Sequence, residues 1–490
     1  MTIDSKITYR VVSRHKRMLA DIITPVSIYL RIRDRFLNSI LLESSDYHGS
    51  DNSFSYIAFD PVARFSYDRN AGAAGQLTVK MPGGDEQTSE LPADGMMDAF
   101  KEFKASFLHE KAPFRFITNG LFGYFSYPAV QSFEDITLHA PIPPENQIPT
   151  AVFTVYRYVL AINHFKDELY LFEHSYLRDG ETESSATTGT LEQDSLDYIS
   201  DLITGRNYPT YSFSTAGPEE SNFTDDEFKA IIQKGKDHCQ RGDVFQIVLS
   251  RRFSTPFVGD EFNVYRALRS LNPSPYLFYF DYGNYKLFGS SPESQIVVKD
   301  RKATIYPIAG TFRRTGDDLH DAELAQKLYD DPKESAEHVM LVDLARNDLS
   351  RNCDVVSVET FKEVQYYSHV IHLVSKVVGN LTETADPLQI VAETFPAGTL
   401  SGAPKHNAMQ LIDRYENLSR SFYAGSIGYM GFDGEFNHCI MIRTFMSKDN
   451  TLYYQAGAGV VAKSVVDSES QEVHNKLAAL RMALEQAKSI

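Results

Sequence analysis

The 490-residue sequence contains no tryptophan and only three cysteines, Cys239, Cys353 and Cys439. These cysteines are far apart, odd in number and without metal-binding spacing, which argues against a disulfide framework and favours a reducing compartment. No run of 18 apolar residues occurs, and the N-terminus has no apolar segment of the kind found in secretory signals. We therefore expect a soluble, cytoplasmic protein that does not bind membranes.

Positive charge is also scarce. The 48 Lys and Arg residues stand against 65 Asp and Glu, which gives a formal net charge of −17. This balance argues against nucleic acid or an anionic membrane as a general partner, so a small anionic substrate would need a local cationic pocket or a metal ion. The length suits one very large or two ordinary domains, and we place a soft boundary near residue 210, between 1–210 and 211–490.

A run near the end of the chain, DSESQEVHNKL at residues 467–477, predicts a helix with a charged face. Glu469, Glu472 and Lys476 occupy positions i, i+3 and i+7, so they share one side of that helix. Asp467 or Ser468 is a suitable N-cap for it.

A second carboxylate pair with the same spacing lies at residues 331–348. Asp331 is a suitable N-cap, Pro332 a suitable first helical residue, and Glu334 and Glu337 share a face. Two helices that each offer two carboxylates suit Mg²⁺, which prefers oxygen ligands. A structural explanation also exists, because glutamate in the first turn stabilises the positive end of a helix. Both explanations stay open from spacing alone.

The rest of the pattern indicates many strands joined by short turns, which favours a largely antiparallel sheet over repeated βαβ units. Strands are predicted for SIYLRIRD at residues 27–34 and for NSILLESSD at residues 38–46. Helices are predicted at 95–108 and from about 224 and 404 onward. The polar run at 178–195 reads as an exposed loop.

Several loops carry residues with chemical potential. SSPES places Glu293 at the start of a strand, HVIHLVS contains His369 and His372, and FPAGTLSGAPK is a glycine-rich loop that opens a helix. Such a loop can present backbone N–H groups to an anion. Each signal alone is weak, because glycine serves turns everywhere and a lone histidine is more often a core or surface residue.

Taken together and in order, these stretches resemble the large, chorismate-utilising subunit of anthranilate synthase. The matching segments are GDVFQIV, NPSPY, SSPES, PIAGT, AEHVMLVDLARND, YSHVIHLVS, GTLSGAPK, YAGSIGY, CIMIRT, AGAGVV and the final E-x-x-E-x-x-N-K, with LLESSD near the N-terminus. The resemblance covers nearly the whole chain. It implies an α/β fold in which two facing, mainly antiparallel sheets form a complex sandwich with helices outside.

The resemblance also implies roles for individual residues. Glu293 would protonate the departing 4-hydroxyl of chorismate, and His372, rather than His369, would serve as base or orienting group for pyruvate elimination. Gln246 and Thr399 complete the implied catalytic set. Mg²⁺ would be held by Glu334, Glu337, Glu469 and Glu472. The implied substrate contacts are Gly310, Thr311, Gly398, Thr399, Tyr423, Arg443, Gly457, Gly459 and Lys476.

Two positions separate this reading from related activities. Water-adding relatives carry a lysine base where this chain has Gln246, and a glutamine cannot take a proton from water at neutral pH. Aminodeoxychorismate synthase carries a nucleophilic lysine where this chain has Ala309, which can form no covalent adduct. Ammonia attack at C2 is the expected reaction. Aminodeoxychorismate synthase component I and a non-catalytic relative that binds aromatic metabolites are the alternatives.

None of the three cysteines lies in a nucleophile elbow, and the resemblance implies that a separate glutamine amidotransferase subunit supplies the ammonia, in a heterotetramer. The resemblance further implies feedback inhibition by tryptophan. The expected tryptophan site comprises Leu42, Glu43, Ser44, Asn272, Pro273, Ser274, Pro275 and Tyr276. An ordinary strand end and an ordinary turn are the alternative explanation of these two stretches.

Overall fold

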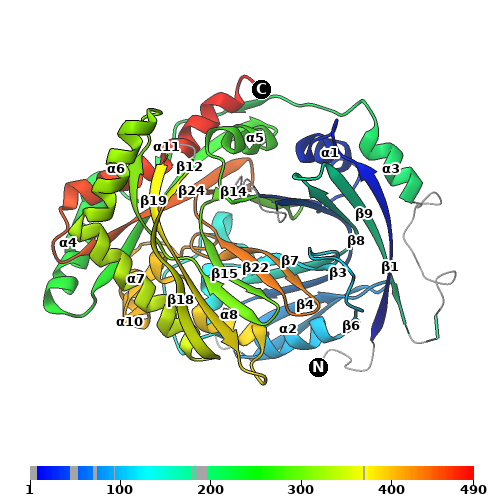
Figure 1. The fold of residues 1–490 in the computed structure, drawn as a ribbon, viewed down its shortest axis with the longest axis horizontal. Coiled ribbons are helices and arrows are strands. Elements are labelled where there is room, and N and C mark those ends of the chain that lie inside the picture. The colour runs from blue at the N-terminus through cyan, green and yellow to red at the C-terminus, as the bar shows by residue number, and fades with distance from the viewer. Residues whose placement is uncertain are drawn as a thin grey trace.

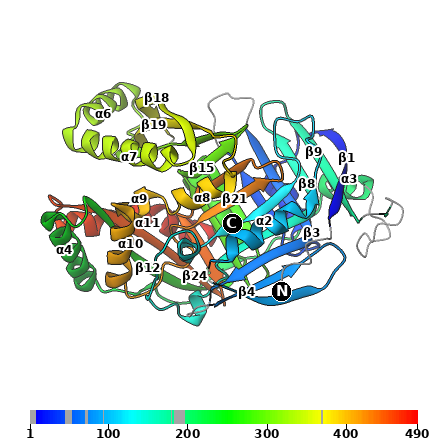
Figure 2. The same cartoon turned by 90° about the horizontal axis from the view of Figure 1, so that it is seen from below.

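A computed structural model describes residues 8–44, 53–69, 74–92, 94–178, 180–181, 196–367 and 370–490. Strands make up the interior and helices lie mainly on the outside (Figures 1 and 2). The helices are α1 (Pro25–Ile32), α2 (Met96–Ala105), α3 (Leu196–Thr204), α4 (Asp225–Arg241), α5 (Phe262–Leu271), α6 (Asp318–Asp330), α7 (Pro332–Ser350), α8 (Pro387–Thr394), α9 (Gly398–Ser401), α10 (Lys405–Tyr415) and α11 (Val466–Ala487).

The strands of the first part of the chain are β1 (Tyr9–Leu19), β2 (Ile40–Glu43), β3 (Phe54–Asp68), β4 (Ala74–Lys80), β5 (Glu86–Pro92), β6 (Phe107–Leu108), β7 (Gly120–Phe125), β8 (Ala151–Asn163) and β9 (Glu168–Leu177). Those of the second part are β10 (Phe213–Thr215), β11 (Glu220–Ser221), β12 (Gln246–Gly259), β13 (Tyr276–Asp281), β14 (Tyr285–Ser291), β15 (Ser294–Lys299), β16 (Lys302–Ile305), β17 (Ile308–Arg313), β18 (Cys353–Tyr366), β19 (Val370–Leu381), β20 (Gly402–Ala403), β21 (Ser426–Gly431), β22 (Phe436–Ile440), β23 (Thr444–Lys448) and β24 (Thr451–Val461).

The sheet has two branches that share the long ladder between β3 and β8. One branch runs from β3 through β2, β13, β14, β23 and β24 to β12. The other runs from β8 through β7, β21, β22, β15 and β16 to β19 and β18. All of these ladders are antiparallel, while β1 and β6 pair in parallel. The predicted α/β class with mainly antiparallel sheets is therefore confirmed.

Hydrogen bonds cross the boundary that we predicted near residue 210. Strand β2 pairs with β13, and β7 pairs with β21, so each branch contains strands from both parts of the chain. The division into 1–210 and 211–490 stays a prediction about function rather than a break in the sheet.

Capping residues explain where the helices begin. Asp331 accepts hydrogen bonds from the backbone N–H groups of Lys333 and Glu334, and Pro332 opens α7, as predicted. Thr224 caps α4 with Glu227 as its capping-box partner. Helix α11 begins two or three residues earlier than the predicted caps imply, because Val465 is its N-cap and neither Asp467 nor Ser468 caps it.

The predicted strand at residues 27–34 is wrong, because this segment belongs to helix α1. Thr24 and Ser27 form a capping box, and Pro25 occupies the first turn. This start signal decides the conformation, although the alternation of apolar and polar residues after it also fits a strand. The neighbouring prediction held, since Ile40–Glu43 forms β2. Most of the predicted 178–195 loop lies outside the described residues.

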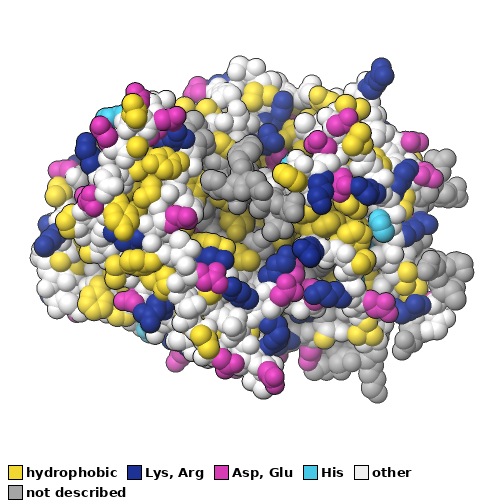
Figure 3. Space-filling view, in the orientation of Figure 1, with side chains coloured by type: hydrophobic (Ala, Val, Ile, Leu, Met, Phe, Trp, Pro, Cys, Tyr) yellow, Lys and Arg dark blue, Asp and Glu magenta, His cyan; other side chains and the backbone are white. Residues whose placement is uncertain are grey.

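Helices α4, α5 and α11 pack against the branch that ends in β12 and β24, and their buried side chains form the largest hydrophobic cluster. No helix among the described residues is long and apolar enough to cross a membrane. Figure 3 shows hydrophobic side chains gathered over the region of α6 and β19. The exposed large ones on α6, α7 and β18 are Leu319, Tyr329, Val339, Val355, Phe361 and Tyr366.

Candidate active site

The predicted site residues meet where the start of β12 and the end of β24 lie beside the facing helices α7 and α11. Gln246 begins β12, and its Nε2 donates a hydrogen bond to Oε1 of Glu337 on α7 at 3.3 Å. A Cβ atom on Gly459 of β24 would lie 2.5 Å from the same Nε2, so a larger residue there would displace the end of the Gln246 side chain. Gly459 thus leaves Gln246 free to reach Glu337.

Two cations lie beside these strands. Lys476 of α11 donates to the backbone carbonyl of Gly457 at 2.8 Å and pairs with Glu472 at 2.7 Å. Arg443, in the connection between β22 and β23, is largely enclosed and has a positive φ of 48°. Burial lowers its pKa, and the nearby Glu293 counteracts this. Both cations act electrostatically on Glu293, so they belong to one site.

Glu293 has the properties of a general acid. Its carboxyl Oε1 accepts a hydrogen bond from the Thr399 hydroxyl at 2.8 Å. Burial raises the pKa of Glu293 to about 7, against the lowering influence of Thr399, Lys476 and Arg443. A carboxyl group with a pKa near neutrality can hold a proton and release it during a reaction.

His372 of β19 is held as a neutral ring. Its Nδ1 lies 2.8 Å from the backbone oxygen of Gly310, so Nδ1 carries the hydrogen and Nε2 is the basic nitrogen. Burial lowers the pKa of His372 to about 4. Gly310 has a φ of +68°. A Cβ atom there would lie 3.2 Å from Oε2 of Glu334, so β17 lies close to α7 at this point. His369 lies outside the described residues, and Thr311 is placed only by its backbone in β17.

The four predicted metal carboxylates gather on two facing helices, Glu334 and Glu337 on α7 and Glu469 and Glu472 on α11. Burial, followed by the charge of Glu337, raises the pKa of Glu334. Burial also raises the pKa of Glu337 and of Glu469, and in each case the charge of Glu472 adds to the rise. The helices are therefore close enough for their carboxylates to repel one another.

This donor set fits a hard divalent cation by its chemistry, because bound positive charge would relieve the repulsion. Within the described part of the chain, no three Asp, Glu, His or Cys side chains converge closely enough to hold a metal ion. The assignment of four ligands stays a prediction.

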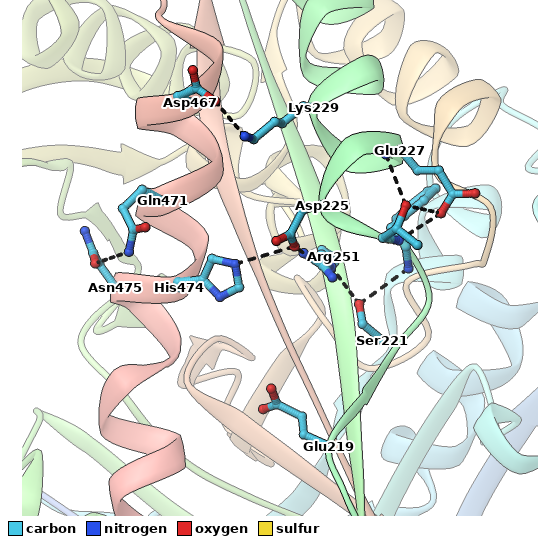
Figure 4. Close-up of polar contacts among 12 residues, drawn as sticks. Glu219, Ser221, Asp225, Glu227, Lys229, Arg251, Asp467, Gln471, His474 and Asn475 are labelled. Atoms are coloured by element: carbon cyan, nitrogen blue, oxygen red, sulfur yellow. Dashed lines mark hydrogen bonds and ion pairs between the residues drawn. The ribbon is translucent and has the colours of Figure 1, made fainter.

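Ion pairs fix the opposite side of α11 (Figure 4). Asp467 pairs with Lys229 of α4 at 2.7 Å, and His474 lies 4.0 Å from Asp225. Asp225 also pairs with Arg251 of β12. With this side anchored to α4 and β12, the side that carries Glu469, Glu472 and Lys476 is turned toward α7.

Sequence reasoning missed a polar pair next to Glu293. Lys405 donates to Asp348 and to the carbonyl of Thr394, both at 3.0 Å. Asp348 and Glu293 line the same small pocket between α7 and the β15 and α9 segments. The signal was present, since Asp348 and Lys405 lie within the AEHVMLVDLARND and GTLSGAPK stretches. A second missed pair, Glu416 and Arg420, is entirely buried.

The two stretches of the expected tryptophan site lie side by side. Strand β2 pairs with β13, with Glu43 opposite Leu277 and Leu42 opposite Phe278. The Glu43 carboxylate already accepts hydrogen bonds from Arg269 and from the Tyr265 hydroxyl, the latter at 2.6 Å. Remaining members line the adjoining turn: Asn272 donates to Ser274 at 3.4 Å, and Pro273, Pro275 and Tyr276 complete it.

Comparison with known proteins identifies the class. The model of the chorismate-binding enzyme family matches residues 39–482, so the chain belongs to that family. Within it, the chain is similar over nearly its full length to proteins called anthranilate synthase component 1. That of Geobacillus stearothermophilus is 38% identical, with 98% of this chain and 95% of the relative covered. That of Aquifex aeolicus is 36% identical, with 97% and 95% covered.

Solved structures agree. Anthranilate synthase component I from Streptococcus pneumoniae superposes with a TM-score of 0.75 at 30% identity, covering 96% of this chain and 99% of that one. The menaquinone-specific isochorismate synthase of Escherichia coli superposes with a TM-score of 0.72 at 19% identity, covering 98% and 95%, and shares the fold.

The carboxylate crowding yields a prediction for Glu337→Gln. The neighbouring carboxylates repel one another, so neutralising one should raise the melting temperature at pH 8 without added metal, by roughly 1–3 °C. Millimolar Mg²⁺ should stabilise the wild type and stabilise the variant less, as followed by differential scanning fluorimetry. Asp343→Asn, an exposed change on the same helix, is the control. Equal Mg²⁺ stabilisation of Glu337→Gln and wild type would remove Glu337 from the ligand set.

Proposed function

We propose that the chain is the chorismate-utilising subunit of anthranilate synthase. The reaction converts chorismate and ammonia into anthranilate, pyruvate and water. The observation that carries this proposal is the buried Glu293 carboxyl, bonded to Thr399 and flanked by the cations Lys476 and Arg443. The full-length similarity to proteins called anthranilate synthase component 1 supports it.

Chorismate carries two carboxylates, and the site offers a counter-charge for each. Lys476 and Arg443 suit the carboxylate of the enolpyruvyl arm, one as a point charge and the other as a planar fork. Glu334, Glu337, Glu469 and Glu472 would hold Mg²⁺, which would bind the ring carboxylate and stabilise charge that develops there. Tyr423 and the backbone around Gly398, Gly457 and Gly459 would enclose the ring.

The first chemical step is a substitution. Glu293 donates its proton to the 4-hydroxyl, the C4–O bond breaks and water leaves, while the lone pair of ammonia forms a bond to C2 with shift of the ring double bonds. The new C2–nitrogen group then loses one proton to solvent. The raised pKa of Glu293 keeps this proton available near neutral pH.

The second step is an elimination. The basic Nε2 of neutral His372 accepts the proton from C2, the C3–O bond breaks and the ring becomes aromatic. The departing enolpyruvate takes up a proton to give pyruvate. A histidine with a depressed pKa is unprotonated at neutral pH and can accept this proton.

Two side chains favour this activity over those of related enzymes. The neutral amide of Gln246 donates to Glu337 and cannot deprotonate water, whereas ammonia attacks with its own lone pair. Ala309 in β17 offers no nucleophile for a covalent adduct. We further propose that a separate glutamine amidotransferase subunit supplies the ammonia in a heterotetramer, and that the protein acts in the cytoplasm.

The direct test is product formation by the purified chain alone. Chorismate, a concentrated ammonium salt at neutral pH and Mg²⁺ should give the fluorescence of anthranilate, with pyruvate released in equal amount. Product that is not anthranilate, such as aminodeoxychorismate or isochorismate, would contradict the proposal. Chorismate binding without turnover would favour a non-catalytic relative.

The pH profile should report Glu293. Activity at a fixed concentration of free ammonia should fall as the pH rises through about 7, because Glu293 loses the proton that it must donate. Glu293→Gln should lose on the order of 10²–10⁴ in kcat, together with this limb of the profile. The folded protein binds this proton more tightly than the unfolded chain, so the variant should be relatively more stable above pH 7.

The exposed substitution Glu383→Gln is the control, with an unchanged profile expected. A wild-type rate that is independent of Glu293 ionisation would exclude Glu293 as the acid.

We also propose that tryptophan inhibits the enzyme by binding in a pocket lined by the end of β2 and the turn that precedes β13. The adjacent stretches Leu42–Glu43–Ser44 and Asn272–Tyr276 support this proposal. Glu43 is ion-paired with Arg269, so a ligand ammonium would share a carboxylate that Tyr265 and Arg269 already orient. Inhibition requires that tryptophan bind a less active state more tightly, and chorismate should in turn weaken tryptophan binding.

Tryptophan binding can be measured directly, because the chain has no indole of its own. Indole emission from the washed complex should increase with added tryptophan until the wild-type sites are full. It should decrease when excess chorismate displaces the tryptophan. Ser44→Phe should abolish both binding and inhibition while leaving anthranilate synthesis intact. Equal inhibition of this variant and the wild type would place the tryptophan site elsewhere.

A further inference from the structure

A buried ion pair lies directly behind the proposed catalytic groups. Arg420 is 1% exposed, and Glu416, four residues earlier at the end of α10, is 5% exposed. The guanidinium donates to Glu416 twice, from Nε at 3.0 Å and from Nη2 at 2.6 Å. Neither side chain is open to a substrate, so the pair can influence a reaction only through what it holds.

The pair holds the backbone on both sides of the site. Arg420 Nη1 donates to the carbonyl of Leu400, and Nη2 donates to the carbonyl of Val248, each at 2.6 Å. Leu400 follows Thr399, whose hydroxyl bonds Glu293, and Val248 lies two residues after Gln246 on β12. One guanidinium thus fixes the spacing between α9 and β12.

Glu416 adds a second attachment to β12 and one to β24. Its Oε1 accepts from both the backbone N–H and the hydroxyl of Ser250, at 2.8 and 2.7 Å. The Ser250 hydroxyl in turn accepts from Gln455 of β24 at 2.7 Å. Gln455 lies two residues before Gly457, whose carbonyl receives Lys476.

The guanidinium also orders an aromatic wall of the site. Its carbon lies 5.6 Å from the ring centre of Tyr423 and 5.1 Å from that of Tyr127. A cation over an aromatic face is attractive, and the attraction strengthens without water. Thr399, Tyr423 and Gly457, which come from three separate segments, are therefore all connected to this one pair.

We propose that Arg420 and Glu416 are positioning residues, which set the Thr399–Glu293 hydrogen bond and so tune proton donation by Glu293. The inference rests on the proposed function. Stability alone does not account for the arrangement, because a buried ion pair contributes little over a well-packed apolar pair of similar volume. Its geometric value is that a planar fork fixes several acceptors at once, which a lysine cannot do.

The first test is Arg420→Lys. Charge is kept, but one ammonium cannot reach Glu416, Leu400 and Val248 in the same fork geometry. We expect kcat to fall on the order of 100-fold, as for a small displacement of a catalytic group, with a far smaller change in the KM for chorismate. The alkaline limb of the pH profile should move to higher pH. The Thr399 hydrogen bond lowers the pKa of Glu293, so loss of this bond should raise that pKa.

The matched control is Arg157→Lys. Arg157 belongs to another buried pair, with Glu173 at 2.9 Å, outside the site. Arg157→Lys should lower the thermal stability as Arg420→Lys does, without moving the alkaline limb of the pH profile. Thr399→Val, which removes the hydrogen bond directly, should move the limb in the same direction, and adding Arg420→Lys to it should produce little further movement.

A double variant separates positioning from folding. Arg420→Met with Glu416→Leu removes both charges, so neither is left unpaired, and the protein should lose less thermal stability than with Arg420→Met or Glu416→Leu alone and still show the lowered kcat and shifted limb. A double variant with wild-type kcat and pH profile overturns the proposal, as does an Arg420→Lys enzyme that loses only stability. Absence of anthranilate from the wild type would instead refute the proposed function.

Discussion

The antiparallel ladder between β12 and β24 is the constraint on which the site depends. It pairs Gln246 with Val461, Val248 with Gly459 and Ser250 with Gly457 without interruption. A slip by one residue would turn every side chain to the other face of the sheet, so this register alone decides that Gln246 meets Gly459. Helix α11 follows β24 after a short turn. The ladder therefore also fixes where α11 begins, and with it the positions of Glu469, Glu472 and Lys476.

The ladder of β12 and β24 together with α11 forms one wall of the site, and helix α7 forms the other. Both helices carry carboxylates, so the two walls have like charges. Helix α7 presents Glu334 and Glu337 to α11, and their pKa values are raised because burial and neighbouring carboxylates disfavour the ionised form. One amide hydrogen bond, from Gln246 to Glu337, joins the two walls. Selection for stability alone would not favour this repulsive arrangement, and a bound divalent cation would relieve the repulsion.

The sequence was informative where function depends on local spacing. Helical periodicity located Glu334, Glu337, Glu469 and Glu472 on two helices, and the Asp331–Pro332 start of α7 followed from capping chemistry. Local pattern failed at α1, where alternating residues suggested a strand and the Thr24 cap decided otherwise. It could not find Glu416 and Arg420, because their partners Val248 and Leu400 are 172 and 20 residues away from Arg420. Pairings of that kind depend on tertiary contacts, which propensity does not encode.

The same tertiary contacts join the turn at Asn272 to the catalytic groups. The Ser290 hydroxyl donates to the carbonyl of Asn272, while the Ser290 N–H donates to the carbonyl of Arg443 at 3.1 Å. The next residue, Ser291, donates through its hydroxyl to the carbonyl of Glu293 at 3.3 Å. Displacement of the Asn272 turn would therefore act on Arg443 and on Glu293, the proposed acid, through two consecutive residues of β14. Coupling of this length needs no change in the sheet register, only a shift at the adjacent ends of β13 and β14, so a ligand bound there could influence the proposed site at little cost to the sheet.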